Sequence, residues 1–298
     1  MARFGAVLTA MITPFGGDDG GIDYELTARL AQWLVSQGNN GLVVAGTTGE
    51  SPTISHAEQT MLFRVVREAV SVPVVAGVGS NNTAESLSLI EAAVKARVDG
   101  LLIVSPYYNR PSQAGLLRHF RTLCEASDLP VMLYDIPIRT GRKVETETIL
   151  ELARSCPTLV ALKDAAGNPG ETARLIAQAP RGFEVYSGDD HLTLPLLSVG
   201  AVGAIGVATH WCAAETGEMI AAYQQGHVER ARHLNARMLE SYEFESSPAA
   251  PNPVPSKAML RTMGWNVGEC RPPMGPTPAG LEDRARRVLA NLVQQRAS

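Results

Sequence analysis

Lys163 is the side chain in this sequence with the clearest capacity for covalent chemistry. It closes the apolar run at residues 159–162, so its amine is expected to lie in a poorly hydrated environment. Such an environment disfavours the charged form and lowers the pKa of the amine, and a neutral amine can attack a ketone carbonyl to form an imine. The alternative interpretation is a structural ion pair with Asp164 or Glu184. Position by itself leaves both interpretations open.

Polar residues that follow other apolar runs could assist such an amine. The segment at residues 46–51 combines two glycines with Thr47 and Thr48 ahead of a predicted helix, which favours a carboxylate held by backbone N–H groups. Tyr134 ends a further run, where a phenol can relay a proton. Arg139 follows after a proline turn and can bind a carboxylate with two hydrogen bonds. Structural interpretations are equally open: a capped turn, a packed phenol and a solvated arginine.

Two further segments carry a weaker chemical signal. Residues 106–111 place two adjacent tyrosines between prolines, although tyrosines with one hydrated end are common in folded proteins. Asp189, Asp190 and His191 follow a seventh apolar run and raise the question of a metal site. The sequence has no comparable acid or histidine cluster after the other runs, and Asp190 suits the N-cap of the next helix. We therefore predict neither a metal ion nor any other cofactor.

The elements that must position these residues alternate regularly along the chain. Short apolar runs are typical of buried parallel strands, and amphipathic segments between them, such as residues 24–37 and 56–70, indicate helices. Eight such units without an early GxGxxG motif favour an α/β fold of the (β/α)8-barrel type, whose active site lies at the carboxyl ends of the strands. The predicted strands are residues 6–11, 41–44, 74–77, 101–104, 131–134, 160–163, 184–187 and 204–207.

The pattern changes after the eighth unit. Residues 246–255 are rich in proline and serine and interrupt a helical pattern. We predict that residues 1–225 form the catalytic barrel and that residues 226–298 form a helical extension packed on it. Helices are expected in the extension at residues 231–243, 256–263 and 279–295.

Composition excludes several classes of protein. The chain has 298 residues and a formal net charge of -4, and it carries no lysine- or arginine-rich block that suggests binding to nucleic acid or to an anionic membrane. Its first apolar run, residues 6–12, is too short to span a membrane. Four separated cysteines without metal-binding spacing indicate reduced thiols. We expect a cytoplasmic protein that binds neither nucleic acid nor membranes.

Taken together, these segments resemble the dihydrodipicolinate synthase/N-acetylneuraminate lyase family of pyruvate-dependent class I aldolases. The resemblance covers almost the whole chain and implies a barrel with C-terminal helices, usually assembled as a homotetramer that is a dimer of dimers. The motifs that carry it are residues 46–51, 106–111, 134–141, 163–164, 187–190 and 252–257.

The resemblance also implies roles for individual residues. Lys163 would form the imine with pyruvate, and Tyr134 would transfer protons as the imine becomes an enamine nucleophile. Thr47 and Tyr108 would complete a relay of hydroxyl groups. In the family, one tyrosine of the pair Tyr107 and Tyr108 comes from the neighbouring subunit, which ties activity to a dimer.

Substrate binding follows from the same resemblance. Thr48 would hold the pyruvate carboxylate, helped by backbone near Gly188 and Ile205. Arg139 would bind the carboxylate of L-aspartate 4-semialdehyde, an arginine that sialic-acid lyases generally lack. The implied reaction is condensation of pyruvate with this aldehyde on the route to diaminopimelate and lysine. The alternatives are another pyruvate aldolase or keto-sugar-acid dehydratase on the same scaffold, and a non-catalytic paralogue that binds a keto acid.

Some positions depart from the family pattern. Gly206 stands where a serine is common, behind the predicted pyruvate pocket. Gln59 replaces a frequent histidine and Pro52 a frequent alanine at the allosteric lysine site of some members, which argues against feedback inhibition by lysine. The residues to which that site would map are Ser51, His56, Asn81, Glu85 and Tyr107.

Overall fold

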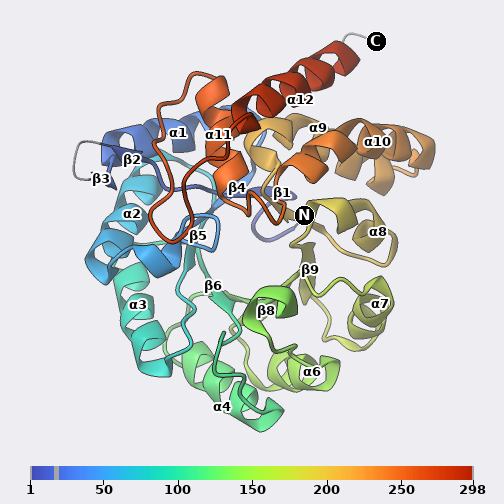
Figure 1. Cartoon of the computed structure of the whole chain (residues 1–298). Helices are drawn as coiled ribbons and strands as arrows, with labels where there is room; N and C mark the ends of the chain where they lie inside the picture. The colour runs from blue at the N-terminus through green and yellow to red at the C-terminus, as the bar shows by residue number, and fades with distance from the viewer. Residues whose placement is uncertain (1, 17–19, 297–298) are drawn as a thin grey trace.

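The chain folds as a closed barrel of parallel strands, as the sequence predicts (Figure 1). The computed structural model describes residues 2–16 and 20–296, and within them eight strands pair in sequence order until β1 meets the last. Each predicted strand is present to within one residue at either end, because its apolar run is buried on both faces. The strands are β1 (Val7–Ala10), β4 (Gly41–Val44), β5 (Val74–Gly77), β6 (Gly100–Val104), β7 (Val131–Asp135), β8 (Leu159–Asp164), β9 (Glu184–Ser187) and β10 (Gly203–Gly206).

Side chains of moderate size fill the barrel interior, among them Val43, Met132 and Ala161. Side chains alternate between the two faces of a strand, so residues two apart point the same way. Tyr134 and Lys163 lie two residues beyond Met132 and Ala161, and they are directly paired across β7 and β8. Both side chains therefore point into the barrel where its interior opens at the carboxyl ends of the strands.

Amphipathic helices surround the barrel, and side-chain caps begin most of them. Asp23, Ser55 and Ser112 each accept a hydrogen bond from a backbone N–H of the first helical turn, which satisfies a donor that has no partner inside the helix. The helices that follow the strands are α1 (Tyr24–Ser36), α2 (His56–Ala69), α3 (Thr83–Lys95), α4 (Gln113–Cys124), α6 (Thr146–Ser155), α7 (Pro169–Gln178), α8 (Thr193–Ser198) and α9 (Thr209–Gln224). Short helices at the strand ends are η1 (Ser51–Thr53), α5 (Pro137–Thr140) and η2 (Asp190–Leu192).

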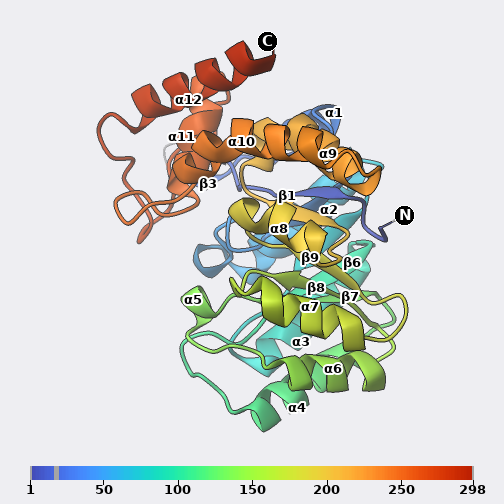
Figure 2. The same ribbon diagram turned by 90° about the vertical axis from the view of Figure 1, so that its right-hand side faces the viewer.

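Three helices form the C-terminal extension: α10 (Val228–Phe244), α11 (Val254–Thr262) and α12 (Leu281–Arg296). They lie together on one side of the barrel in Figure 2. One apolar cluster joins α9 to this extension, with Met219, Met238, Met259 and Val288 among its members. The predicted division between residues 225 and 226 falls in the turn between α9 and α10, and it stays a prediction.

A small antiparallel sheet formed by β2 (Phe15–Gly16) and β3 (Gly21–Ile22) has no counterpart among the predicted strands. It lies against the extension, because the Phe15 N–H donates to the carbonyl oxygen of Val267 at 3.0 Å. No helix in the described part of the chain combines the length and apolar character needed to cross a bilayer.

Candidate active site

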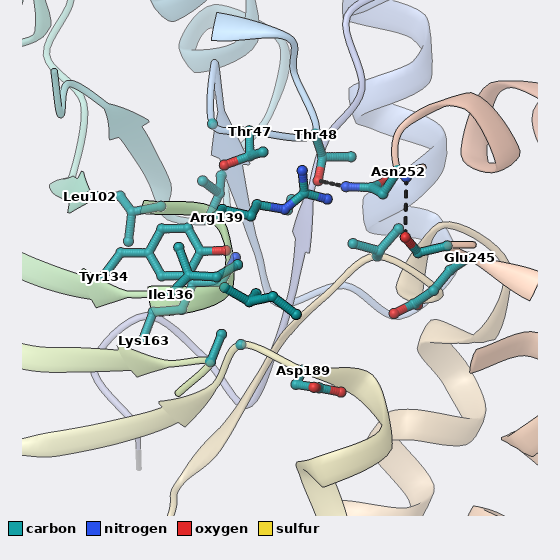
Figure 3. Close-up of a pocket in the computed structure, with 18 of the residues that line it drawn as sticks. Thr47, Thr48, Leu102, Tyr134, Ile136, Arg139, Lys163, Asp189, Glu245 and Asn252 are labelled. Carbon is teal, nitrogen blue, oxygen red and sulfur yellow. Dashed lines mark hydrogen bonds between the residues drawn. The ribbon is translucent and has the colours of Figure 1, made fainter. Parts of the chain in front are cut away.

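A pocket of about 330 Å³ opens at the carboxyl ends of the strands (Figure 3). It brings together residues that the sequence places far apart, because parallel strands of a barrel end at the same rim. Two predicted residues do not line it: Ile205 is fully buried in the interior below, and Tyr108 lies on the surface. The predicted site residues in the pocket wall are Thr47, Thr48, Tyr134, Arg139, Lys163 and Gly188.

The amine of Lys163 lies in the buried part of this pocket. Only 5% of the residue is exposed, and Nζ lies 4.3 Å from the centre of the Tyr134 ring. Burial lowers the pKa of the amine to about 8, although the negative charge of Asp190 opposes this shift. A neutral and nucleophilic amine is therefore accessible close to physiological pH.

The carboxylates considered as ion-pair partners of Lys163 are engaged elsewhere. Asp164 accepts hydrogen bonds from the Thr172 hydroxyl at 2.5 Å and from a backbone N–H. Glu184 accepts from the Arg3 N–H at 3.0 Å and from the Tyr186 hydroxyl at 2.8 Å. The interpretation of Lys163 as a structural cation paired with either residue is thus wrong.

The phenol of Tyr134 is poised as a proton donor. Burial raises its pKa, while the Arg139 charge and a hydrogen bond with Thr47 act in the opposite direction. The shift keeps the phenol protonated at neutral pH. Tyr134 can therefore donate or relay a proton, with the Thr47 hydroxyl as its neighbour in the chain of donors.

A residue of the extension, Asn252, completes the wall beside Thr48. Its amide donates to the Thr48 hydroxyl oxygen at 2.9 Å, as Figure 3 shows. Because the hydroxyl accepts this bond, its own hydrogen remains available to a substrate carboxylate. Asn252 belongs to one of the sequence motifs, but no role was predicted for it. Its position in a proline-rich break after the barrel was the only feature of the sequence that set it apart.

A buried ion pair anchors the loop that carries Thr47 and Thr48. Lys257 Nζ lies 2.7 Å from Glu50 Oε1, and the two side chains are 1% and 0% exposed. The Arg271 N–H donates to the other Glu50 oxygen at 2.9 Å. Glu50 has a φ of 60°, a left-handed conformation that a residue other than glycine adopts only when its surroundings hold it there. The extension thus fixes the loop that faces the pocket.

Arg139 lies at the mouth of the pocket, on the four-residue helix α5. Its side chain is exposed, and it forms no ion pair with any residue that the structure describes. A guanidinium that lines a pocket without a protein carboxylate is available to an anionic substrate group.

Tyr108 does not line the pocket of its own chain. It is 87% exposed with a φ of 71°, whereas Tyr107 is half-buried. An exposed tyrosine in a strained loop conformation is typical of a residue that acts at a surface. The predicted hydroxyl relay therefore lacks its tyrosine within the single chain.

The residues of the predicted allosteric site lie around the loops that follow β4, β5 and β6. The Asn109 side-chain amide donates to the Asn81 carbonyl oxygen at 2.9 Å, which joins two of these loops. Lysine binding here stays a prediction of the resemblance. The positions are Ser51 in η1, His56 at the start of α2, Asn81 before α3, Glu85 in its first turn and Tyr107 after β6.

The two acids after β9 have different roles from those predicted. Asp189, not Asp190, caps the following helix, and its carboxylate accepts the His191 N–H at 3.0 Å. Asp190 is buried and instead accepts the Val207 N–H at 2.7 Å, because its side chain turns towards the end of β10. Within residues 2–16 and 20–296, no three histidine, cysteine or acidic side chains are grouped so as to hold a metal ion.

Comparison with known proteins gives matches over nearly the whole chain. The model of the dihydrodipicolinate synthetase family matches residues 3–295. The chain is 46% identical over 294 residues to a 4-hydroxy-tetrahydrodipicolinate synthase from Parasynechococcus marenigrum (strain WH8102), which covers 98% of this chain and 96% of the relative.

Solved structures agree with the sequence matches. A dihydrodipicolinate synthase from Cyanidioschyzon merolae with lysine bound superposes with a TM-score of 0.95 and 41% identity, covering 98% of this chain and 99% of that one. A chloride-inhibited dihydrodipicolinate synthase from Acinetobacter baumannii complexed with pyruvate gives a TM-score of 0.91 and 32% identity, with 97% and 99% covered.

Proposed function

Because this chain belongs to the dihydrodipicolinate synthetase family, we propose that it condenses pyruvate with L-aspartate 4-semialdehyde through an imine on Lys163. This is the reaction of a 4-hydroxy-tetrahydrodipicolinate synthase, the name that the compared relative carries. The observation that carries the proposal is the buried amine of Lys163, with a pKa of about 8, in a pocket that also presents Arg139.

The pocket residues support each step of such a reaction. The neutral amine of Lys163 attacks the keto carbon of pyruvate, and water leaves as the protonated imine forms. Loss of a proton from the pyruvyl methyl group gives an enamine, whose carbon attacks the aldehyde. Tyr134 and Thr47 move protons, while the Thr48 hydroxyl and the backbone at Gly188 hold the keto-acid carboxylate.

Replacing Arg139 by alanine is expected to separate the two substrates. Loss of a hydrogen-bonded charge partner costs about 1.5–3 kcal/mol, so kcat/KM for the semialdehyde should fall roughly 10- to 100-fold. Trapping of pyruvate on the enzyme should change little. Arg118→Ala, an exposed arginine on the outer helix α4, is the matched control. Equal losses in both steps would show that Arg139 does not select the aldehyde.

Self-association forms part of the proposal, because the exposed Tyr108 can complete only a neighbouring pocket. We expect a homotetramer in which Tyr108 joins the hydroxyl relay of the adjacent subunit. Tyr108→Phe and Lys163→Ala should each be nearly inactive, and mixing them should restore activity in pockets that combine the intact Lys163 of one chain with the intact Tyr108 of the other. Absence of recovery in this mixture would contradict a shared site. Mixing Lys163→Ala with a variant that carries both substitutions is the negative control, because no chain in that mixture has Lys163.

The aldehyde is tested directly by measuring pyruvate consumption with a panel of aldehydes. L-Aspartate 4-semialdehyde is expected to give the highest kcat/KM, because Arg139 faces the second substrate. A higher value for a sugar-derived aldehyde would instead assign the chain to another class I pyruvate aldolase.

A cytoplasmic location is proposed with this biosynthetic role, and four free, buried cysteines support a reducing compartment.

A further inference from the structure

Two acidic side chains meet behind the pocket, at the carboxyl end of β10. Asp190 Oδ2 accepts the Val207 N–H at 2.7 Å, and Glu245 Oε2 accepts the Ala208 N–H at 3.1 Å. Consecutive backbone amides thus hold one oxygen of each carboxyl group, which brings the two groups close enough for a hydrogen bond between them. Glu245 follows α10 and lines the pocket on the side away from Tyr134 in Figure 3.

Gly206 is the residue that makes this arrangement possible. A Cβ atom at this position would lie 2.4 Å from Asp190 Oδ1 and 2.7 Å from Thr209 Cγ2, so any side chain would displace the carboxyl group. Because Gly206 replaces the serine that is common in the family, the Asp190 carboxyl group can occupy the space that the serine side chain would fill.

The acid pair lies close enough to Lys163 to affect its charge. The segment that carries Asp190 packs against the lysine, because a Cβ on Gly188 would lie 2.9 Å from Lys163 Cγ. The charge of Asp190 raises the pKa of Lys163, and Glu245 would raise it to a smaller extent if it were also ionised. Both carboxyl groups therefore act on the residue that forms the imine.

A hydrogen bond between two carboxyl groups requires a proton, since two carboxylates offer only acceptors. Burial raises the pKa of both groups, and that of Glu245 is raised further by the neighbouring Asp190. Asp190 has the shorter bond to a backbone N–H, which favours its ionised form. The proton thus belongs mainly to Glu245.

We propose that Asp190 and Glu245 form a carboxylic acid–carboxylate pair that keeps one proton at neutral pH and places a single negative charge behind Lys163. One charge stabilises the protonated imine, whereas a second would hold the free amine in its unreactive protonated form. The pair acts through the lysine, so both acids are positioning residues and their shared proton stays in place during the reaction. This inference rests on the proposed imine at Lys163.

Two of the titratable groups packed around the pair are uncharged at neutral pH. His210 is neutral, because burial lowers its pKa to about 4, and burial keeps the Tyr242 phenol protonated by raising its pKa. Arg139, across the pocket, lowers the pKa of Lys163 and opposes the pair. The titratable groups that surround the pair from η2, α9 and α10 are Asp189, His191, His210, Cys212, Glu215 and Tyr242.

Amide substitutions distinguish a shared proton from two independent charges. In Asp190→Asn or Glu245→Gln, an amide N–H replaces the shared proton and the remaining carboxylate keeps the single charge. Glu245→Gln should therefore retain the wild-type pH dependence of borohydride trapping of pyruvate on Lys163, and Asp190→Asn should shift it only slightly, because the charge then lies on Glu245. The double variant loses the charge, and its profile should shift to lower pH by about one unit, because the Lys163 amine then loses its proton more readily.

The result that overturns the proposal is a shift in each single variant that adds up in the double variant, or no shift in the double variant. Glu243→Gln, at an exposed acid in the last turn of α10, is the matched control. Infrared spectroscopy at neutral pH detects the protonated carboxyl group directly. The wild type should show the C=O stretching band of a protonated carboxyl group, and both single variants should lack it. Absence of this band in the wild type would also overturn the proposal. Failure of the wild type to trap pyruvate would instead refute the imine on Lys163. The infrared band would still show whether the acid pair holds a proton.

Discussion

Borohydride reduction in the presence of pyruvate is expected to attach one pyruvyl group to the protein, at Lys163. Lys163→Ala should lose this adduct, and its kcat should be lower than that of the wild type by about 10³-fold or more, which is typical when a covalent nucleophile is removed. Mass spectrometry of the intact protein and of its peptides measures both outcomes. Lys143 is an internal control, because its ion pair with Asp135 at 3.1 Å keeps its amine protonated. Absence of a mass gain would remove the imine from the proposal.

The pH dependence of the same reaction follows from the pKa of Lys163. Burial lowers that pKa to about 8, so the fraction of neutral amine rises as pH increases through this value. The initial rate of imine formation should therefore climb between about pH 7 and 9 and then level off. A rate that keeps rising towards the ordinary pKa of a solvent-exposed lysine would show that the amine is not desolvated in the enzyme.

Lys257→Met is expected to have the largest effect on stability. It leaves the Glu50 carboxylate buried without its partner at 2.7 Å, and removal of one member of a buried ion pair costs about 3–5 kcal/mol. The free energy of unfolding, measured in urea, should fall by this amount. Activity should fall as well, since Glu50 ends the loop that carries Thr47 and Thr48.

An exposed pair provides the comparison. Lys95 and Glu91 lie 4.0 Å apart with side chains 79% and 75% exposed, so Lys95→Met should cost less than about 1 kcal/mol. Glu50→Gln combined with Lys257→Met should recover part of the lost stability, because no uncompensated charge remains buried. Equal losses from Lys257→Met and Lys95→Met would mean that the buried pair does not anchor the loop.

The strands were predictable because burial on both faces leaves a local signal. Each apolar run, such as residues 74–77, is continuous and lies between two segments with a helical pattern, so the pattern needs no knowledge of distant contacts. The β2–β3 sheet was missed because two-residue strands carry no periodicity. Asp190 was wrongly placed at an N-cap because the two adjacent acids suit the cap equally, and only the amide of Val207 distinguishes them.

By itself, the sequence determined the barrel, its strand ends and the pocket residues that these ends present, Lys163 and Tyr134 above all. Such residues follow from short-range patterns and from the rule that parallel strands of a barrel end at one rim. Only the tertiary structure decided that Lys163 pairs with neither Asp164 nor Glu184, that Asn252 orients Thr48, and that Glu245 meets Asp190. These contacts join residues up to about 200 positions apart. Their energies depend on burial and distance, and a local pattern of residue types predicts neither quantity.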